Sequence, residues 1–391
     1  MRYLLLRMKR FCGFITGFVF FLSGIVKLMD PVGAGLVMNE YYGFLHLGFL
    51  PFSSKVAGTM FALAETLIGT ALITGVWRKA VAVSAVALQG FFTFLTLLMV
   101  IFKPEMDCGC FGEAIHLTHT ETFIKNLILL ALLLIYYIPR KHLGETRKKK
   151  YISFALVSLS VLAFTVYSWI YIPMVDFTAY RTGTDLQIAE RATSDEIYES
   201  VFTYEKDGIR ETFTLGHIPD STWTFISAET RLKEGHEESL ANLSFYKESS
   251  GEYADHLAAE GKVMVISVYD TKIKEKRWKA IEAFIGRSES AGFTALLLCA
   301  SPEGVPASLK DTVFISDYKT LITLNRSNGG VTYFHNGQLV RKWAGINAPD
   351  KAELEDIFAT DATETAIDED SKGSLGFQGF LLYVFAVMLL L

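Results

Sequence analysis

The first part of the chain consists of long apolar runs, whereas the part that follows alternates short apolar runs with polar stretches. A transmembrane helix needs about 20 consecutive apolar residues. Runs of that length predict membrane spans, in chain order, at Phe11–Leu28, Val56–Val76, Val81–Phe102, Leu117–Ile138 and Tyr151–Ile172. We therefore expect an α-helical membrane bundle over residues 1–150 and a fifth span over residues 151–173.

Charge sets the orientation of these spans. Residues 1–173 hold 16 Lys and Arg, and 12 of them lie before the first run, between the second and third, or between the fourth and fifth. Cationic residues collect in cytoplasmic loops. We expect the N-terminus inside the cell and Lys103–His116 outside, together with the residues after Tyr171. The first run also resembles a signal peptide, but its length and the lack of a small-x-small exit argue against cleavage.

Two further apolar stretches are not ordinary spans. Val32–Phe52 is interrupted by glycines, and its aromatic residues suit a membrane interface, so we expect a helix on the outer surface or a re-entrant loop. Gly379–Leu391 has only 13 residues, which leaves open a short span, a surface anchor or an incomplete tail. Its acidic approach, Asp361–Asp370, predicts a flexible linker. Residues 361–391 are therefore expected to be a linker followed by a short apolar segment.

Residues 174–360 predict a soluble, acidic outer domain, since the chain after residue 173 holds 34 Asp and Glu against 21 Lys and Arg. Val201–Tyr204 and Arg210–Leu215 flank Lys206-Asp207-Gly208, which is a hairpin signal. Further strand and helix patterns follow from about residue 246. They are a strand at Val263–Tyr269, a helix at Glu275–Glu289, a strand at Thr294–Cys299, a hairpin of Gly330–His335 and Gln338–Trp343 around Asn336-Gly337, and a helix at Asp350–Phe358.

This order of elements resembles the thioredoxin-like superfamily over about Tyr246–Thr360, and the hairpin VTYFHNGQLVRKWAG carries much of the resemblance. An active thioredoxin carries C-x-x-C after its first core strand and a cis-proline before its final hairpin. Val268–Lys272 and Ser327–Gly330 stand at those places here, without cysteine or proline. We expect this domain to bind or position a partner rather than to perform dithiol chemistry, and its lone Cys299 to be a buried, inert thiol.

The candidate chemistry is concentrated in Asp107-Cys108-Gly109-Cys110-Phe111-Gly112, between the third and fourth spans. Two thiols one residue apart can close a strained disulfide ring that is easier to reduce than a structural disulfide, and glycine supplies the backbone freedom. Three interpretations stay open: a redox pair, a structural staple, and half of a metal site. His116 and His119 would have to complete the metal site, but their spacing fits no common zinc pattern, so we expect no metal.

A carboxylate inside a predicted span is the second candidate. Glu65 lies near the middle of the second span, where an ionisable side chain is costly unless it is neutral or paired. It either takes part in function or bonds a neighbouring helix. Lys27 is a candidate partner, although snorkelling to the lipid headgroups is the stronger expectation for it. Gly13, Gly17 and Gly24 predict close helix packing, and Cys12, at the inner end of the first span, is expected to be inert.

These residues carry a second resemblance, over about residues 11–138. Phe21-Leu-Ser-Gly24-Ile-Val-Lys27 with Asp30-Pro31, Glu65-Thr-Leu-Ile-Gly69 leading to Gly75-Val-Trp-Arg78, and Cys108-Gly-Cys-Phe-Gly112 are similar to the DoxX-like membrane family, and more narrowly to its branch around the methylamine-utilisation protein MauE. The resemblance implies a bacterial inner-membrane protein linked to thiol redox chemistry or to the maturation of exported proteins.

Our first hypothesis is therefore a membrane thiol–disulfide component in which Cys108 and Cys110 exchange electrons with an exported thiol protein. A membrane quinone is the candidate cofactor, the outer domain docks the partner, and Glu65 relays protons or orders the helices. The rival hypothesis is a non-enzymatic membrane scaffold with a structural C-x-C loop. A transporter would rest on Glu65 and Lys27 alone, without the repeats that such folds show. The composition argues against a cytosolic enzyme, a disulfide-rich scaffold and a nucleic-acid partner.

Overall fold

A computed structural model describes residues 2–104, 106, 108–115, 117–138, 146–186, 198–206, 209–214, 223–232, 242–248 and 250–390. The chain forms two compact units, one of residues 1–178 with 368–391 and one of residues 179–367. Some features expected from the sequence lie outside the described residues: His116, the basic residues Arg140 and Lys141, and the turn residues Asp207 and Gly208.

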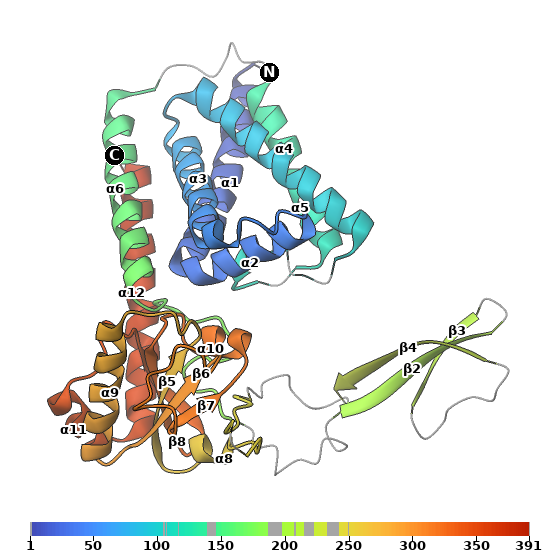
Figure 1. Cartoon of the computed structure of the whole chain (residues 1–391). Helices are drawn as coiled ribbons and strands as arrows, with labels where there is room; N and C mark the ends of the chain where they lie inside the picture. Colours follow the sequence, from blue (N-terminus) through green and yellow to red (C-terminus); the bar gives the residue numbers. More distant parts are fainter. Residues whose placement is uncertain are drawn as a thin grey trace. The chain divides into compact units, whose positions relative to one another are not determined.

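The first unit is helical, and its helices follow the apolar runs (Figure 1). They are α1 (Arg2–Met29), α2 (Pro31–Phe44), the 3₁₀ helix η1 (Pro51–Ser53), α3 (Ser54–Thr74), α4 (Arg78–Phe102), α5 (His119–Tyr137), α6 (Lys148–Ile170) and most of α12 (Ala362–Leu390), with the short strand β1 (Cys110–Glu113) before α5. Among the described residues, 6 helices are long and apolar enough to cross a membrane: α1, α3, α4, α5, α6 and α12.

The stretch after α1 is a helix, which is one of the two forms expected for it. Asp30 begins α2 as its N-cap, since the side chain accepts a hydrogen bond of 2.8 Å from the backbone N–H of Gly33. Pro31 at the first helical position has no N–H to leave unsatisfied. The break between α1 and α2 therefore follows from these two adjacent residues.

Glycines let α1 and α3 pack closely, as the sequence predicted. A Cβ atom on Gly17 would lie 2.9 Å from the carbonyl oxygen of Gly69, and one on Gly24 would lie 2.6 Å from the carbonyl oxygen of Ala62. Gly13 instead makes room for the ring of Tyr136. Small residues at such contacts let two helix backbones approach each other. Dispersion attraction then holds the helices together, because lipid provides no hydrophobic effect between them.

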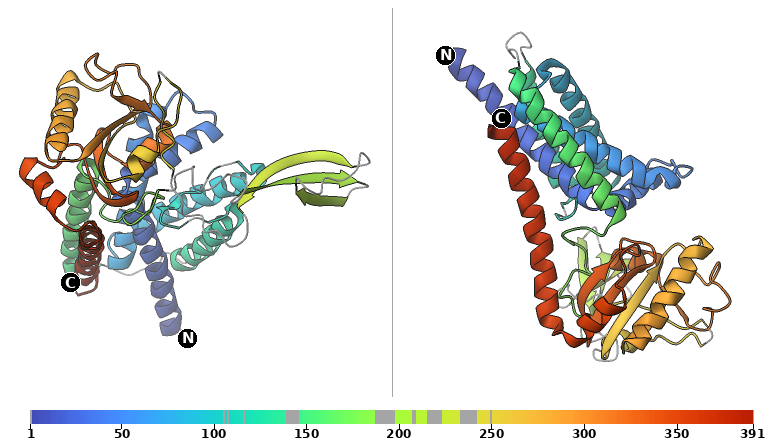
Figure 2. Two further views of the ribbon diagram at one scale, coloured as in Figure 1. Left: turned by 90° about the horizontal axis from the view of Figure 1, so that it is seen from below. Right: turned by 90° about the vertical axis from the view of Figure 1, so that its left-hand side faces the viewer.

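The acidic segment before the last apolar run differs from the flexible linker that we expected, because it is the first part of α12 (Figure 2). Asp361 accepts hydrogen bonds from the backbone N–H groups of Thr363 and Glu364, at 2.9 and 3.1 Å. Ala362 and Ala366 are buried against the core of the second unit. Acidic residues at the start of a helix also complement its dipole, so the charge that reads as disorder here favours the helix.

The apolar half of α12 packs along α6. Lys150 Nζ donates to the carbonyl oxygen of Met388 at 3.0 Å, and Ser153 Oγ donates to that of Val387 at 2.7 Å. Near the other end, the rings of Phe164 and Phe380 stack with centroids 4.7 Å apart. The two helices are therefore antiparallel neighbours, and the 13-residue run recognised in the sequence is the end of a longer helix.

The second unit contains a mixed sheet with the strand order β7-β6-β5-β8-β9 and a smaller sheet with the order β3-β2-β4. The strands and helices are β2 (Tyr198–Lys206), β3 (Ile209–Thr214), β4 (Thr224–Leu232), α8 (His256–Ala259), β5 (Lys262–Val268), α9 (Glu275–Ser290), β6 (Thr294–Cys299), β7 (Val313–Ile315), α10 (Tyr318–Leu324), β8 (Gly330–His335), β9 (Gln338–Trp343) and α11 (Lys351–Ala359). β5 pairs with β6 in parallel and with β8 antiparallel.

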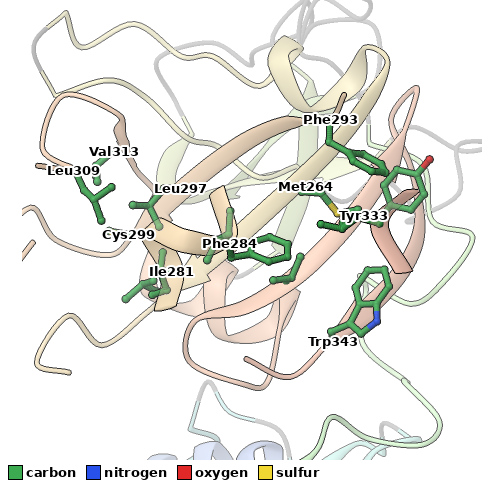
Figure 3. Packing of buried hydrophobic residues seen from close by; sticks show 14 of the residues in the cluster. Met264, Ile281, Phe284, Phe293, Leu297, Cys299, Leu309, Val313, Tyr333 and Trp343 are labelled. Carbon is green, nitrogen blue, oxygen red and sulfur yellow. The ribbon is translucent and has the colours of Figure 1, made fainter. Parts of the chain in front are cut away.

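Side chains of the larger sheet alternate between two apolar layers, as a strand period of two requires. Met264 and Ile266 face the layer that contains Trp278 and Phe284 of α9 (Figure 3). Val263 and Val265 face the opposite layer, which α8 and α10 cover. Both faces of the central strand are therefore buried, which explains its nearly continuous apolar sequence.

The expected strand, helix, strand, hairpin and helix of this domain are confirmed. Asn336 and Gly337 both have positive φ, 48° and 84°, as a two-residue type I′ turn demands. The sequence analysis missed β4, α8, β7 and α10. β7 and α10 span only three and seven residues, which is too short for a periodic pattern to stand out.

We predict that Gly69→Ala destabilises the membrane unit. Its Cβ would lie 2.5 Å from the backbone nitrogen of Phe21, so α1 and α3 would have to separate, at a cost of about 1–3 kcal/mol. The measurement is the thermal unfolding midpoint of the full chain in detergent. Gly90→Ala is the matched control, since nothing lies within 4 Å of that position. Equal midpoints for the two variants would contradict the close contact.

Candidate functional site

The contact between α1 and α3 brings Lys27 and Glu65 together. Lys27 Nζ lies 2.6 Å from Glu65 Oε2, and the side chains are 15% and 6% exposed. The expectation that Lys27 snorkels to the headgroups was therefore wrong, because its side chain reaches back along α1 toward the carboxylate. The negative charge of Glu65 on α3 is therefore balanced by the positive charge of Lys27 on α1.

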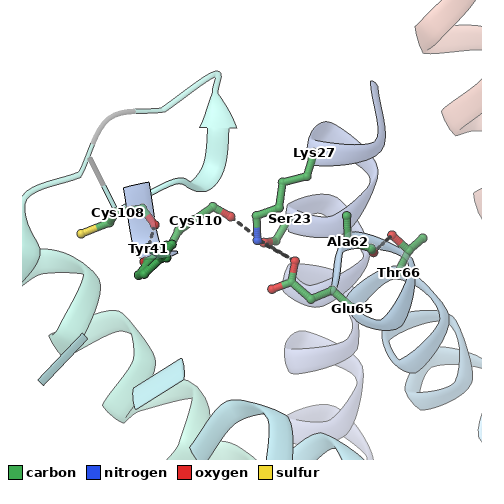
Figure 4. A network of polar contacts seen from close by, with 8 residues as sticks. All are labelled: Ser23, Lys27, Tyr41, Ala62, Glu65, Thr66, Cys108 and Cys110. Atoms are coloured by element: carbon green, nitrogen blue, oxygen red, sulfur yellow. Dashed lines mark hydrogen bonds and ion pairs between the residues drawn. The ribbon is translucent and has the colours of Figure 1, made fainter. Parts of the chain in front are cut away.

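Ser23 connects this ion pair to the cysteine loop (Figure 4). Its Oγ accepts from Lys27 Nζ at 3.2 Å and lies 2.7 Å from the carbonyl oxygen of Cys110, against 3.3 Å from Glu65 Oε2. A hydroxyl has one proton to donate, and the shorter distance assigns it to Cys110. The result is a chain of donors from Lys27 through Ser23 to the loop backbone.

A second hydroxyl holds the other cysteine. Tyr41 OH of α2 donates to the carbonyl oxygen of Cys108 at 3.0 Å. Gly109 between them has a φ of +59°, and a Cβ there would lie 2.3 Å from Val37 Cγ1. Glycine is thus required twice, for its backbone angle and for its lack of volume. Two side-chain donors and one tight contact fix the backbone of the C-x-C loop.

The two thiols differ in exposure. Cys108 is buried, with 4% of its surface exposed, and Cys110 is half-buried. No disulfide joins them in this structure. The sulfur of Cys108 points away from Ser23 and Glu65 (Figure 4). The hydrogen bonds from Ser23 and Tyr41 therefore hold the loop through its backbone carbonyl oxygens.

Both cysteines, Ser23, Lys27 and Glu65 line one cavity of about 260 Å³ inside the first unit. The rest of the lining is largely apolar and aromatic. Phe61 and Phe91 stack with ring planes 5° apart, and Lys27 Nζ lies 5.8 Å from the centroid of the Phe92 ring. An apolar pocket with a few convergent polar groups is the usual form of a small-molecule site.

A second polar cluster on this cavity was missed from the sequence. Gln89 Nε2 of α4 donates to the carbonyl oxygen of Asn126 at 3.1 Å, and Asn126 Nδ2 of α5 donates to Thr96 Oγ1 at 3.3 Å. Gln89 and Asn126 are buried. An amide side chain inside an apolar run is a signal that could have revealed this cluster in the sequence, because such side chains form hydrogen bonds between helices in lipid.

The structure does not join the remaining candidates to this site. His119 Nε2 lies 2.9 Å from the carbonyl oxygen of Met106, and no group of three or more His, Cys, Asp or Glu side chains gathers anywhere in the described ranges. Cys12 is buried in a separate apolar cluster with Leu133 and Tyr136. Burial raises the pKa of Cys299, in the second unit, to about 12, so its thiolate is scarce at neutral pH.

In the second unit, the loop after β5 and the loop before β8 contact each other. The backbone N–H of Asp270 donates to Asn328 Oδ1 at 3.1 Å, and Asn328 Nδ2 donates to the carbonyl oxygen of Asp270 at 2.7 Å. The Asn328 side chain thus joins these two loops through a pair of hydrogen bonds to the backbone of Asp270.

Comparisons with known proteins reach parts of this chain. Residues 2–139 match the family model of the methylamine utilisation protein MauE, which includes the ion pair and the C-x-C loop. Residues 198–235 match a domain of unknown function, DUF8463. No curated protein and no solved structure matches the chain. The MauE match, together with the apolar helices, indicates a multi-pass integral membrane protein.

We predict that Lys27→Met is more destabilising than Lys27→Met combined with Glu65→Leu. Removing one member of a buried ion pair leaves an uncompensated charge, which costs about 3–5 kcal/mol, whereas replacing both is close to neutral. The measurement is the thermal unfolding midpoint of each variant in detergent.

Lys125→Met is the control for this prediction. Lys125 also lines the cavity, but its ammonium lies over the ring of Phe111, 4.7 Å from the centroid. Its loss therefore leaves the Lys27–Glu65 pair intact. A double variant that loses the sum of the two single effects would show that Lys27 and Glu65 act independently.

Proposed function

We propose that the protein is a membrane thiol–disulfide component whose redox pair is Cys108 and Cys110. The observation that carries the proposal is the placement of both cysteines on the same cavity as the buried Lys27–Glu65 pair. An intramembrane ion pair is costly and marks a functional site by default. The two thiols on the same cavity are the groups that could perform redox chemistry at this site.

The anchoring of the loop favours redox chemistry over a structural staple. Ser23 and Tyr41 hold the two cysteine carbonyls, and Gly109 is pressed against Val37. A disulfide would add little to a backbone fixed in this way. The anchors instead hold the loop backbone in place, so that the two cysteines can cycle between dithiol and disulfide without a rearrangement of the helices.

In the proposed reaction, the disulfide form of the pair oxidises an exported dithiol protein. A partner thiolate attacks one sulfur of the Cys108–Cys110 disulfide and forms a mixed disulfide, and the second partner thiol then releases Cys108 and Cys110 as two thiols. The partner loses two electrons and two protons, and the pair gains them. Re-oxidation of the pair requires a membrane-soluble acceptor of two electrons.

The cavity fits a quinone as that acceptor. A bound quinone would take up the two electrons and two protons of the dithiol. Phe61, Phe91 and Phe92 supply apolar surface for a flat ring, and Lys27 supplies a hydrogen-bond donor at the polar end. Glu65 orients the Lys27 ammonium and is the carboxylate available to take up or release a proton beside the cavity.

The second unit is proposed as the partner-docking domain. Its mixed sheet and the order of β5, α9, β6 and the β8–β9 hairpin support a thioredoxin-like fold, and the polar Asp270–Asn328 contact occupies the place of the dithiol. A domain of this kind binds a thiol protein without exchanging electrons itself.

A non-enzymatic scaffold is the second candidate, and the burial of Cys108, of which 4% is exposed, favours it. Buried structural cysteines are inert, whereas reactive ones are partly exposed. In that case the two cysteines matter for stability alone.

We predict that Cys108 and Cys110 cycle between disulfide and dithiol in the cell, and that Cys108→Ser and Cys110→Ser each abolish this cycle while the protein accumulates normally. The measurement is the redox state of the pair in growing cells, by acid quenching and alkylation with a mass-shifting reagent, in a chain whose Cys12 and Cys299 are serine. A mixed population that shifts toward dithiol when respiration is blocked is the expected result.

The same serine replacements at Cys12 and Cys299 serve as matched controls and should leave function intact. A pair that stays oxidised under every condition, or serine variants that fail to accumulate, would remove the redox proposal and leave the scaffold.

We also propose a bacterial inner-membrane location, with the N-terminus inside, the second unit outside and α12 as a sixth span. α6 begins at Lys148–Lys150, which the charge pattern places inside, and α12 ends beside Lys150. Phosphatase fused after Thr360 should then be active and phosphatase fused after Leu391 inactive, with the reverse for a green fluorescent protein. Phosphatase activity at both positions would place α12 on the outer surface instead.

A further inference from the structure

The second unit has a pocket of its own, of about 200 Å³, between one face of α9 and the loop that follows β9. Ile281 and Phe284 of α9, Val331 of β8 and Ile346 of the loop supply apolar surface. Two arginines of α9, Arg277 and Arg287, line the same space. A pocket that combines apolar side chains with two guanidinium groups is suited to an amphiphilic anion.

Arg277 is held in place by its surroundings. Its Nη2 donates to the carbonyl oxygen of Asn328 at 2.9 Å. A Cβ on Gly345 would lie 2.2 Å from that nitrogen, and Gly329, with a φ of +70°, packs against the same side chain. Two glycines therefore make room for one guanidinium, which fixes its position at one side of the pocket.

The surroundings of the Arg287 guanidinium do not satisfy it in the way that those of Arg277 do. Its Nε is buried and has no hydrogen-bond partner, and its guanidinium lies beside the ring of Phe284, 5.8 Å from the centroid. Within the described part of the chain, neither Arg277 nor Arg287 forms an ion pair with a carboxylate. A buried N–H without a partner is costly and rare in folded proteins.

We propose that this pocket binds the carboxylate, or another oxyanion, of a small organic acid, with Arg287 as the principal donor. The guanidinium forms charge-assisted hydrogen bonds to two oxygens of a planar carboxylate. The apolar side chains contact the body of the ligand, and Arg277 adds positive charge nearby. The pocket is smaller than the roughly 300–1,000 Å³ of drug-sized sites, which limits the ligand to a small acid, at most about the size of benzoate. The inference does not depend on the redox proposal.

The experiment is calorimetric titration of the full chain in detergent with benzoate, and with benzamide as its neutral counterpart of the same shape. Saturable binding of benzoate without binding of benzamide is expected. Arg287→Gln should weaken benzoate binding about tenfold or more, because the charge-assisted hydrogen bonds to the carboxylate are lost. The benzoate affinity of Arg287→Lys should fall between those of the unchanged protein and Arg287→Gln, because lysine keeps the positive charge and lacks the planar guanidinium.

Lys276→Gln is the matched control, since it removes one positive charge from α9 at an exposed position away from the pocket. Each variant is checked by its unfolding midpoint, so that a loss of fold is not read as a loss of binding. Inorganic phosphate is titrated in parallel. Tighter binding of phosphate than of benzoate, with the same dependence on Arg287, supports the oxyanion site and assigns it to phosphate.

Three results would overturn the proposal: no binding of either anion at millimolar concentration, equal binding of benzoate and benzamide, or undiminished binding by a folded Arg287→Gln variant.

Discussion

A charged carboxylate inside a membrane needs a counter-charge at hydrogen-bond distance, and the arrangement of the first unit follows from meeting that need for Glu65. Only the close approach of α1 and α3 at Gly17, Gly24 and Gly69 lets Lys27 reach Glu65 Oε2 at 2.6 Å. The same approach places Ser23 between the ammonium and the backbone of Cys110. Helix packing, charge balance and the position of the cysteine loop are thus one constraint rather than three.

The same constraint gives the cavity a polar end and an apolar part. The ion pair and the loop provide the polar end, and the rings of Phe61, Phe91 and Phe92 provide the apolar part. The matched region of the MauE family model, residues 2–139, includes all of these side chains. The redox proposal and the scaffold proposal both build on this arrangement, and they differ in whether sulfur or backbone is the part of the loop that matters.

Sequence patterns predicted the elements that depend on local or periodic signals. Apolar runs located the membrane helices, and Asn336-Gly337 predicted its turn because only a left-handed backbone closes that hairpin. The sequence did not reveal what depends on contacts between distant segments. Lys27 was expected at the headgroups, since its depth alone does not show that Glu65 lies within reach. The acidic start of α12 was expected as a linker, because its buried alanines have partners far away in sequence. The pairing of Gln89 with Asn126 and the role of Arg287 are hidden for the same reason.

The hydroxyls of α3 have a consequence for how the membrane unit is assembled. Thr59, Thr66, Thr70 and Thr74 each donate to the carbonyl oxygen four residues earlier, so α3 satisfies these groups without help from any neighbour. Glu65 is different, because its partner belongs to another helix. The hydroxyls of α3 therefore need only the folding of α3 itself, whereas the charge balance of Glu65 needs the association of α1 with α3. A chain in which the two helices are each formed but not yet paired has satisfied threonines and an unsatisfied carboxylate.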